Sequence, residues 1–120
     1  MFVLLEHAVG ESVHWDFLIE MSHSLDLATW RLARDPSRVT CDPIDAERIA
    51  DHRRLYLNYE GPISGDRGTV RRVDRGESCV VSSSPERWRF SLRGACLSGD
   101  FEIIGGRTAR WTACSTSVPD

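Results

Sequence analysis

The chain has 120 residues, of which 41% are hydrophobic, and it carries 15 basic against 18 acidic side chains for a formal net charge of −3. This length favours one domain, and the charge balance argues against broad non-specific binding to nucleic acid, which requires a large positive surface. No apolar run approaches the ~20 residues of a membrane helix, so a cytoplasmic protein is expected. All of the basic residues are arginine, which fits either a coding bias or phosphate recognition by guanidinium groups.

The first half of the chain alternates between strand and loop patterns. We expect strands over residues 2–7, 13–21 and 27–33, a loop over 35–43, and one or two helical turns over 44–51. Gly10-Glu11-Ser12 supplies a turn between the first two strands. In the second strand one face is apolar, and the other face, which we expect to meet solvent or a pocket, carries His14, Asp16, Leu18 and Glu20.

The second half is rich in turn residues and short strand patterns. Residues 61–68 form a glycine-rich loop, and strands are expected over 69–73, 78–82, 87–93, 100–104 and 109–113. Many short strands at such regular spacing indicate a sandwich or a barrel. The widely spaced cysteines exclude a zinc knuckle or a redox motif, so we expect reduced, mostly buried thiols at Cys41, Cys79, Cys96 and Cys114.

His14 and Asp16 lie two residues apart in a predicted strand, so their side chains project from the same face. His7 lies in the preceding strand, across a short turn. Nitrogen and oxygen ligands that converge in this way can hold a divalent transition metal. The alternative is an ordinary surface pair of His14 and Asp16, to which His7 is unrelated.

A second cluster contains His52 and Tyr56, four residues apart. A helix or a turn would bring both side chains to one pocket, where a histidine can stabilise a phosphoryl oxyanion and a tyrosine can donate a hydrogen bond to it. Alternatively, the segment is a solvated turn with Tyr56 in the core. The loop over 61–68, which carries Arg67, lacks the P-loop pattern and is interpreted first as a structural connection. His23 is expected in an exposed turn.

Further motifs extend these two clusters. Residues 14–20 read H-W-D-F-L-I-E, residues 51–56 read D-H-R-R-L-Y, residues 59–61 read Y-E-G, Asp74-Arg75-Gly76 follows, and L-x-G occurs at 92–94 and 97–99. Together with His7, these motifs resemble the 3′-phosphoesterase domain of bacterial ligase D, the multifunctional end-joining ligase. The resemblance spans residues 2–113 and keeps the order and spacing of several motifs.

The resemblance implies a fold and a set of site residues. The expected fold class is mainly β, a single compact β-barrel with one or two short helical segments, with residues 1–114 as the domain and 115–120 as a flexible tail. A divalent metal, manganese with zinc or cobalt as alternatives, would be held by His7, His14 and Asp16. The scissile phosphate would be contacted by His52 and Tyr56.

The resemblance also implies a substrate and partners. The family removes 3′-phosphates and 3′-terminal ribonucleosides from primer ends, so we expect a DNA-repair hydrolase that acts on the 3′ ends of DNA or primer strands. No ligase or polymerase region is recognised in the sequence, so an end-joining ligase or polymerase would act with it in trans. No membrane partner is expected.

Two positions depart from the family pattern. Leu18 replaces an arginine that points at the phosphate, and Leu5 replaces a glutamine. Either another arginine, such as Arg67 or Arg89, binds the phosphate, or activity is reduced or lost. The alternative function is therefore a catalytically weakened module that binds metal or nucleic-acid ends and recruits repair proteins. A β-barrel without any site is the third interpretation.

Overall fold

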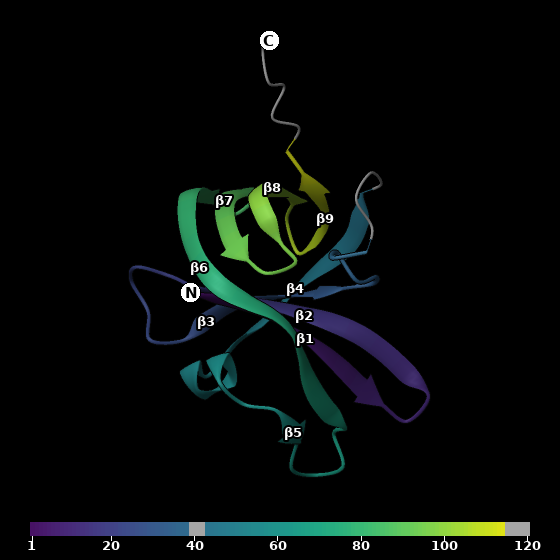
Figure 1. The fold of residues 1–120 in the computed structure, drawn as a ribbon. Helices are drawn as coiled ribbons and strands as arrows, with labels where there is room; N and C mark the ends of the chain where they lie inside the picture. The colour runs from purple at the N-terminus through teal and green to yellow at the C-terminus, as the bar shows by residue number, and fades with distance from the viewer. Residues whose placement is uncertain (39–42, 115–120) are drawn as a thin grey trace.

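The computed structural model describes residues 1–38 and 43–114, and these form one antiparallel sheet (Figure 1). The strands are β1 (Phe2–Val9), β2 (Ser12–Glu20), β3 (Leu27–Leu32), β4 (Ile44–His52), β5 (Gly61–Pro62), β6 (Thr69–Ser84), β7 (Arg87–Gly94), β8 (Ser98–Gly105) and β9 (Thr108–Ala113). A short 3₁₀ helix, η1 (Arg54–Leu57), lies between β4 and β5. The mainly β fold class is confirmed.

The sheet closes on itself. Its strand order is β1-β2-β3-β4-β9-β8-β7-β6-β5, and β1 also pairs with β6, so all strands except β5 form a ring. Closure pairs strand edges that would otherwise be open to other chains. Among the described residues, no helix is long and apolar enough to cross a membrane.

The interior of the ring is filled by an aromatic and aliphatic core. Phe17 of β2 stacks on Phe90 of β7 with 5.1 Å between ring centroids, and it meets the edge of Trp111 of β9 at 4.9 Å. Trp30 of β3 and Trp88 of β7 add another edge-to-face pair at 4.8 Å. Each fully buried phenylalanine stabilises the fold by about 1.5–3 kcal/mol, so side chains from opposite strands hold the ring together.

A smaller apolar cluster lies on the outer face of β1, β2 and β3. This outer cluster consists of Val3, Leu5, Leu18, Leu27, Leu57 and Val70. The segment after β4 covers it, because Leu57 belongs to η1 and Arg54 of η1 forms an ion pair with Glu20 of β2. The prediction that this face of β2 meets solvent or a pocket is therefore wrong at Leu18, which is fully buried.

Two other predictions about elements are corrected. Residues 44–51, expected to be helical, belong to the strand β4, because β4 pairs with β3 on one side and with β9 on the other. These ladders outweigh the helix propensity of the alanine, glutamate and arginine residues in the segment. The strands expected over 69–73 and 78–82 are parts of one strand, β6, which continues through Gly76.

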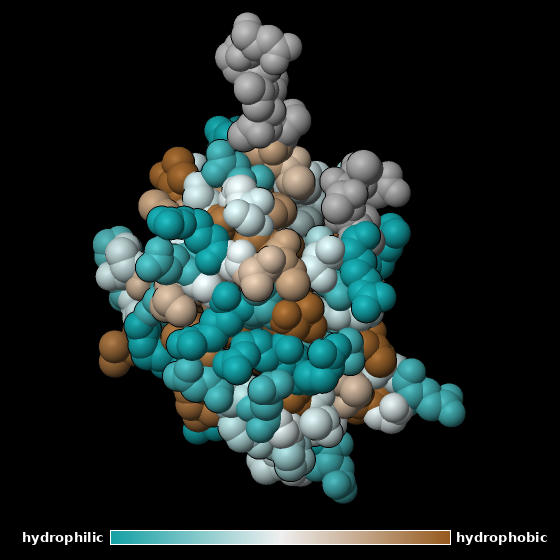
Figure 2. All heavy atoms as spheres, viewed as in Figure 1, coloured by the Kyte–Doolittle hydropathy of each residue, from teal (hydrophilic) through white to brown (hydrophobic). Residues whose placement is uncertain are grey.

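The face shown in Figure 2 is mostly hydrophilic (teal). The hydrophobic residues (brown) reach this face only in small separate patches. The thiols of Cys79, Cys96 and Cys114 are free, but Cys79 and Cys96 are exposed, so the expectation of mostly buried thiols is wrong for them. Cys41 and the tail expected over 115–120 lie outside the described residues.

Candidate metal centre and phosphate cavity

The hairpin of β1 and β2 carries the candidate metal ligands. A two-residue turn that begins at Gly10 joins the strands, and Gly10 has a φ of 59°, which glycine adopts without a steric penalty. The short turn fixes a register in which His7 lies directly opposite His14. Since Asp16 follows His14 by two residues, the three side chains project together from the outer face of the ring.

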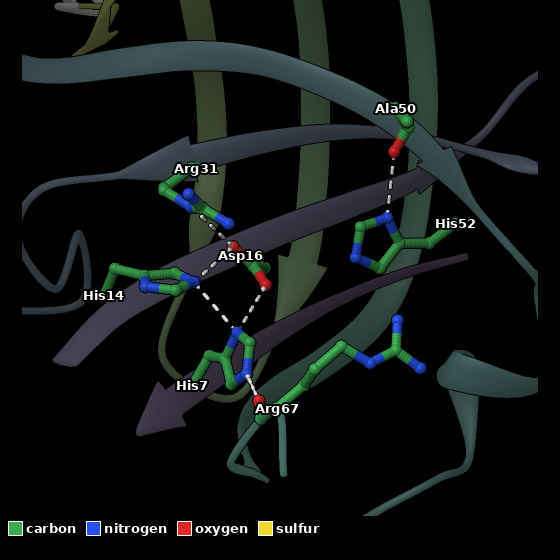
Figure 3. A network of polar contacts seen from close by, with 7 residues as sticks. All are labelled: His7, His14, Asp16, Arg31, Ala50, His52 and Arg67. Carbon is green, nitrogen blue, oxygen red and sulfur yellow. Dashed lines mark hydrogen bonds and ion pairs between the residues drawn. The ribbon is translucent and has the colours of Figure 1, made fainter. Parts of the chain in front are cut away.

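The donor atoms of these three side chains form a small triangle (Figure 3). His7 Nδ1 lies 2.9 Å from His14 Nε2, His14 Nε2 lies 3.3 Å from Asp16 Oδ1, and His7 Nδ1 lies 3.6 Å from Asp16 Oδ2. Ligands about 2.1 Å from one ion, in tetrahedral or octahedral geometry, are themselves roughly 3.0–3.4 Å apart. The observed distances of 2.9–3.6 Å are close to this spacing, so these three residues would hold a metal ion between them.

The environment of Asp16 also suits a bound cation. Asp16 is 2% exposed, and within the described residues its Oδ1 accepts no hydrogen bond. A buried carboxylate oxygen without a hydrogen bond is unfavourable, and the Arg31 Nε at 4.0 Å offsets the desolvation of its charge only in part. Two imidazole nitrogens and one carboxylate oxygen form a donor set that fits manganese, zinc or cobalt.

His7 is oriented by the loop between β5 and β6. Its Nε2–H donates to the carbonyl oxygen of Arg67 at 2.7 Å, which leaves the Nδ1 lone pair facing the other two ligands. Gly68 allows this loop to approach β1: its φ is 89°, and a Cβ there would lie 2.1 Å from the carbonyl oxygen of Ala8. The loop between β5 and β6 therefore fixes the orientation of the His7 ring.

A cavity of about 220 Å³ lies beside the triangle, and residues of both predicted clusters line it. His52, the last residue of β4, donates its Nδ1–H to the carbonyl oxygen of Ala50 at 2.9 Å, which leaves Nε2 on the side of Asp16 (Figure 3). The ring of Tyr56 in η1 meets the His52 ring edge-on, with 5.5 Å between centroids. The structure thus brings His52 and Tyr56 to the same cavity as His7 and Asp16.

The two arginines expected to bind phosphate lie in different places. Arg67 lines the cavity, although its Nε already donates to the carbonyl oxygen of Ser64 at 2.7 Å. Arg89 is not brought to this cavity, because the pairing of β7 with β8 places it next to Glu102, with 4.0 Å between Nε and Oε2. A hydrogen bond from Arg87 lowers the pKa of Glu102, and this carboxylate group therefore provides a local counter-charge.

Arg31 joins the site although the sequence did not single it out. β3 pairs with β2 so that Arg31 lies opposite Asp16, and its Nε is 4.0 Å from Asp16 Oδ1. The other residues of β3 are buried, whereas the Arg31 side chain is 45% exposed. An arginine inside a strand with no other charged residue is the available signal, but the register that places it opposite Asp16 cannot be inferred from the sequence.

Two other motif residues hold the backbone rather than line the cavity. Glu60 accepts a hydrogen bond at 2.9 Å from the backbone N–H of Arg72, next to the bulge in the β1–β6 ladder. Asp74 is buried, and its carboxylate accepts hydrogen bonds of 2.7–3.0 Å from the backbone N–H groups of Arg75, Ala95, Cys96 and Leu97. Asp74 therefore fixes the connection between β7 and β8.

Comparison with known proteins places this geometry in a family. No curated protein sequence matches the chain. The model of the DNA ligase D 3′-phosphoesterase domain matches residues 6–105, a range that contains the three candidate ligands, His52 and Tyr56. This match covers most of the chain, and the chain therefore belongs to the DNA ligase D 3′-phosphoesterase domain family.

Proposed function

We propose that the protein is a cytoplasmic, metal-dependent phosphoesterase that removes 3′-phosphates or 3′-terminal ribonucleosides from DNA or primer strands during end-joining repair. Family membership supports a phosphoesterase-like role in end processing. The observation that supports the metal dependence is the convergence of the His7 and His14 nitrogens with the Asp16 carboxylate, at 2.9–3.6 Å. Oδ1 of this carboxylate is buried without a hydrogen bond within the described residues.

Each residue has a distinct role in this proposal. His7, His14 and Asp16 hold the divalent ion, which supplies Lewis-acid activation of a phosphoryl oxygen when bound. His52 donates its Nδ1–H to Ala50 and directs Nε2 to the phosphoryl group, where the ring, doubly protonated as an imidazolium, would donate a second N–H to developing negative charge. Tyr56 packs against the His52 ring, limits its rotation and offers a hydroxyl group to the phosphate.

The proposed partners are nucleic-acid 3′ ends and, in trans, an end-joining ligase or polymerase that would use the cleaned end. Ligation and polymerisation both require a 3′-hydroxyl group. Hydrolysis of a 3′-phosphate yields this group directly, whereas release of a 3′-terminal ribonucleoside leaves a 3′-phosphate that the first reaction then removes. The small net charge of −3 favours recognition of an end at one cavity over binding along a duplex.

The direct test is manganese-dependent release of phosphate from a primer that ends in a 3′-phosphate. We expect the His14→Ala variant to fall to the rate of the metal-free protein, because one of the three ligands is lost. His23→Ala is the matched control, since His23 is exposed and is not one of the three ligands. Equal rates for the wild type and His14→Ala, with several metals and with both classes of 3′ end, would rule the proposal out.

A second candidate function is a catalytically weakened module that binds metal or nucleic-acid ends and recruits repair proteins. The observation that favours it is the outer cluster, in which Leu5 and Leu18 are 1% and 0% exposed and present no polar group to a phosphate. Stoichiometric metal binding and binding of 3′ ends, without release of phosphate or ribonucleoside, would select this function over the first.

A further inference from the structure

Arg31 occupies an unusual position among the arginines of the molecule. It lies opposite Asp16 in the β2–β3 ladder, on the same outer face as the three candidate ligands. Its Nε is 4.0 Å from Asp16 Oδ1, beyond the range of a hydrogen bond. Arg31 therefore forms a long ion pair with a candidate metal ligand, and this pair does not use an N–H of the guanidinium group in a hydrogen bond.

Arg31 also stands where two cavities meet. It lines the cavity of about 220 Å³ that contains His52 and Tyr56. It also lines a larger groove of about 640 Å³, which includes His14 and crosses β3, β4, β8 and β9. A phosphoryl group beside the metal ligands would thus lie at the mouth of a groove able to take the rest of a substrate, with Arg31 between the two.

The donors of Arg31 are available, unlike those of the arginines nearby. Arg67 donates from Nε and Nη2 to Ser64, and Arg54 is paired with Glu20. Within residues 1–38 and 43–114, Arg31 donates no hydrogen bond, and its side chain is 45% exposed. A guanidinium group has five donors in a planar fork, which matches two oxygens of one phosphoryl group.

We propose that Arg31 is a phosphate-binding residue of this site, and that its guanidinium group grips two non-bridging oxygens of the phosphoryl group held against the metal ligands. This inference rests on the proposed function, since it assigns a ligand to the same site. The ligand class is a phosphoryl group, carried either by a terminal 3′-phosphate or by the phosphodiester before a terminal ribonucleoside.

The primary experiment measures binding of inorganic phosphate to the manganese-loaded protein by titration calorimetry. We expect Arg31→Ala to weaken phosphate binding about 10- to 100-fold, because charge-assisted hydrogen bonds are lost. Arg31→Lys should recover part of the affinity, since lysine keeps the charge but loses the fork. Arg93→Ala is the control, because Arg93 is on β7, 81% exposed and paired with Glu77.

Manganese binding, followed by electron paramagnetic resonance, separates a phosphate-binding role from a structural role. We expect Arg31→Ala to bind manganese as the wild type does. Unchanged phosphate affinity in Arg31→Ala, an equal loss in Arg93→Ala, loss of manganese binding, or no phosphate binding by the wild type would each overturn the assignment. If phosphate binding depends on Arg31 but no 3′ end is turned over, the assignment of Arg31 as a phosphate-binding residue holds and the proposed activity is refuted.

Steady-state kinetics on the two substrate classes identifies the source of the phosphoryl group. We expect Arg31→Ala to raise KM or lower kcat for primers with a 3′-phosphate and for primers with a 3′-terminal ribonucleotide, whereas Arg93→Ala keeps wild-type values for both. A change in KM or kcat for only one of the two substrate classes would show that Arg31 binds the phosphoryl group of that class. Wild-type kinetic constants for Arg31→Ala on both classes would contradict the proposal.

Discussion

Leu18 determines whether the outer face of β2 can offer a side chain to a phosphate group. It follows Asp16 by two residues, so it shares a face with the metal ligands, yet it is fully buried among Val3, Leu5 and Leu57. The residues of this cluster are apolar and offer a guanidinium group no hydrogen-bond acceptor from their side chains. In the proposed site, an arginine that contacts phosphate would therefore come from another element, and Arg31 on β3 lines the same cavity.

We predict that Leu18→Arg destabilises the protein rather than restoring a phosphate contact. An unpaired charge in the outer cluster should lower the free energy of unfolding by about 3–5 kcal/mol. Leu25→Arg is the matched control, because Leu25 is 81% exposed and surface substitutions usually change stability by less than about 0.5 kcal/mol. Denaturant unfolding measures both variants, and equal stability of Leu18→Arg and the wild type would contradict the buried position of Leu18.

At the scale of elements, the hairpin and the loop before β6 build the proposed metal centre from segments far apart in the chain. β1 and β2 supply the ligands, and the loop supplies the Arg67 carbonyl that orients His7. The loop can approach β1 because Gly68 has no side chain. Its sequence shows a glycine-rich turn, but the contact with Ala8 depends on the β1–β6 pairing.

We predict that Gly68→Ala damages both the loop and the metal site. The φ of 89° and the 2.1 Å approach to Ala8 leave no room for a Cβ, so a stability loss of at least about 1–3 kcal/mol is expected. Displacement of the Arg67 carbonyl should also weaken manganese binding about 10- to 100-fold. Gly106→Ala is the control, since a Cβ there meets nothing within 4 Å. Wild-type affinity and stability in Gly68→Ala would show that the loop is not constrained in this way.

Element patterns were predictable from the sequence where they were local. Period-two alternation and the turn at Gly10 placed His7, His14 and Asp16 on one face, as the structure shows. β4 was mistaken for a helix because its residues favour helix in isolation, while its two neighbouring strands are distant in sequence. Arg31 was missed for the same reason, because the register of β3 against β2 follows from tertiary packing.

At the scale of the whole molecule, closure of the ring joins β1 to β6 and places the outer cluster under η1. Asp74 lies in β6, where the pairing of β6 with β1 closes the ring. It pairs with Leu4 in the β1–β6 ladder, and it accepts hydrogen bonds from the backbone between β7 and β8. Asp74 therefore links the beginning of the chain through its backbone and the segment between β7 and β8 through its carboxylate.

We predict that Asp74→Asn lowers the stability of the entire fold. An amide group would turn an N–H₂ toward backbone N–H donors, so a loss of about 1–3 kcal/mol is expected, or roughly 4–12 °C in Tm. Asp45→Asn is the control, because Asp45 is 81% exposed and its nearest cation, Arg110, is 3.7 Å away. Thermal unfolding followed by circular dichroism measures both, and equal Tm values for Asp74→Asn and the wild type would refute this role.

The central claim is that His7, His14 and Asp16 form one metal site on the outer face of the ring. Titration of manganese into the protein, followed by electron paramagnetic resonance, tests it most directly. The account predicts one ion bound per chain in the wild type and in His23→Ala, and no stoichiometric binding in His14→Ala. Absence of stoichiometric binding in the wild type, or equal binding in His14→Ala, would contradict it.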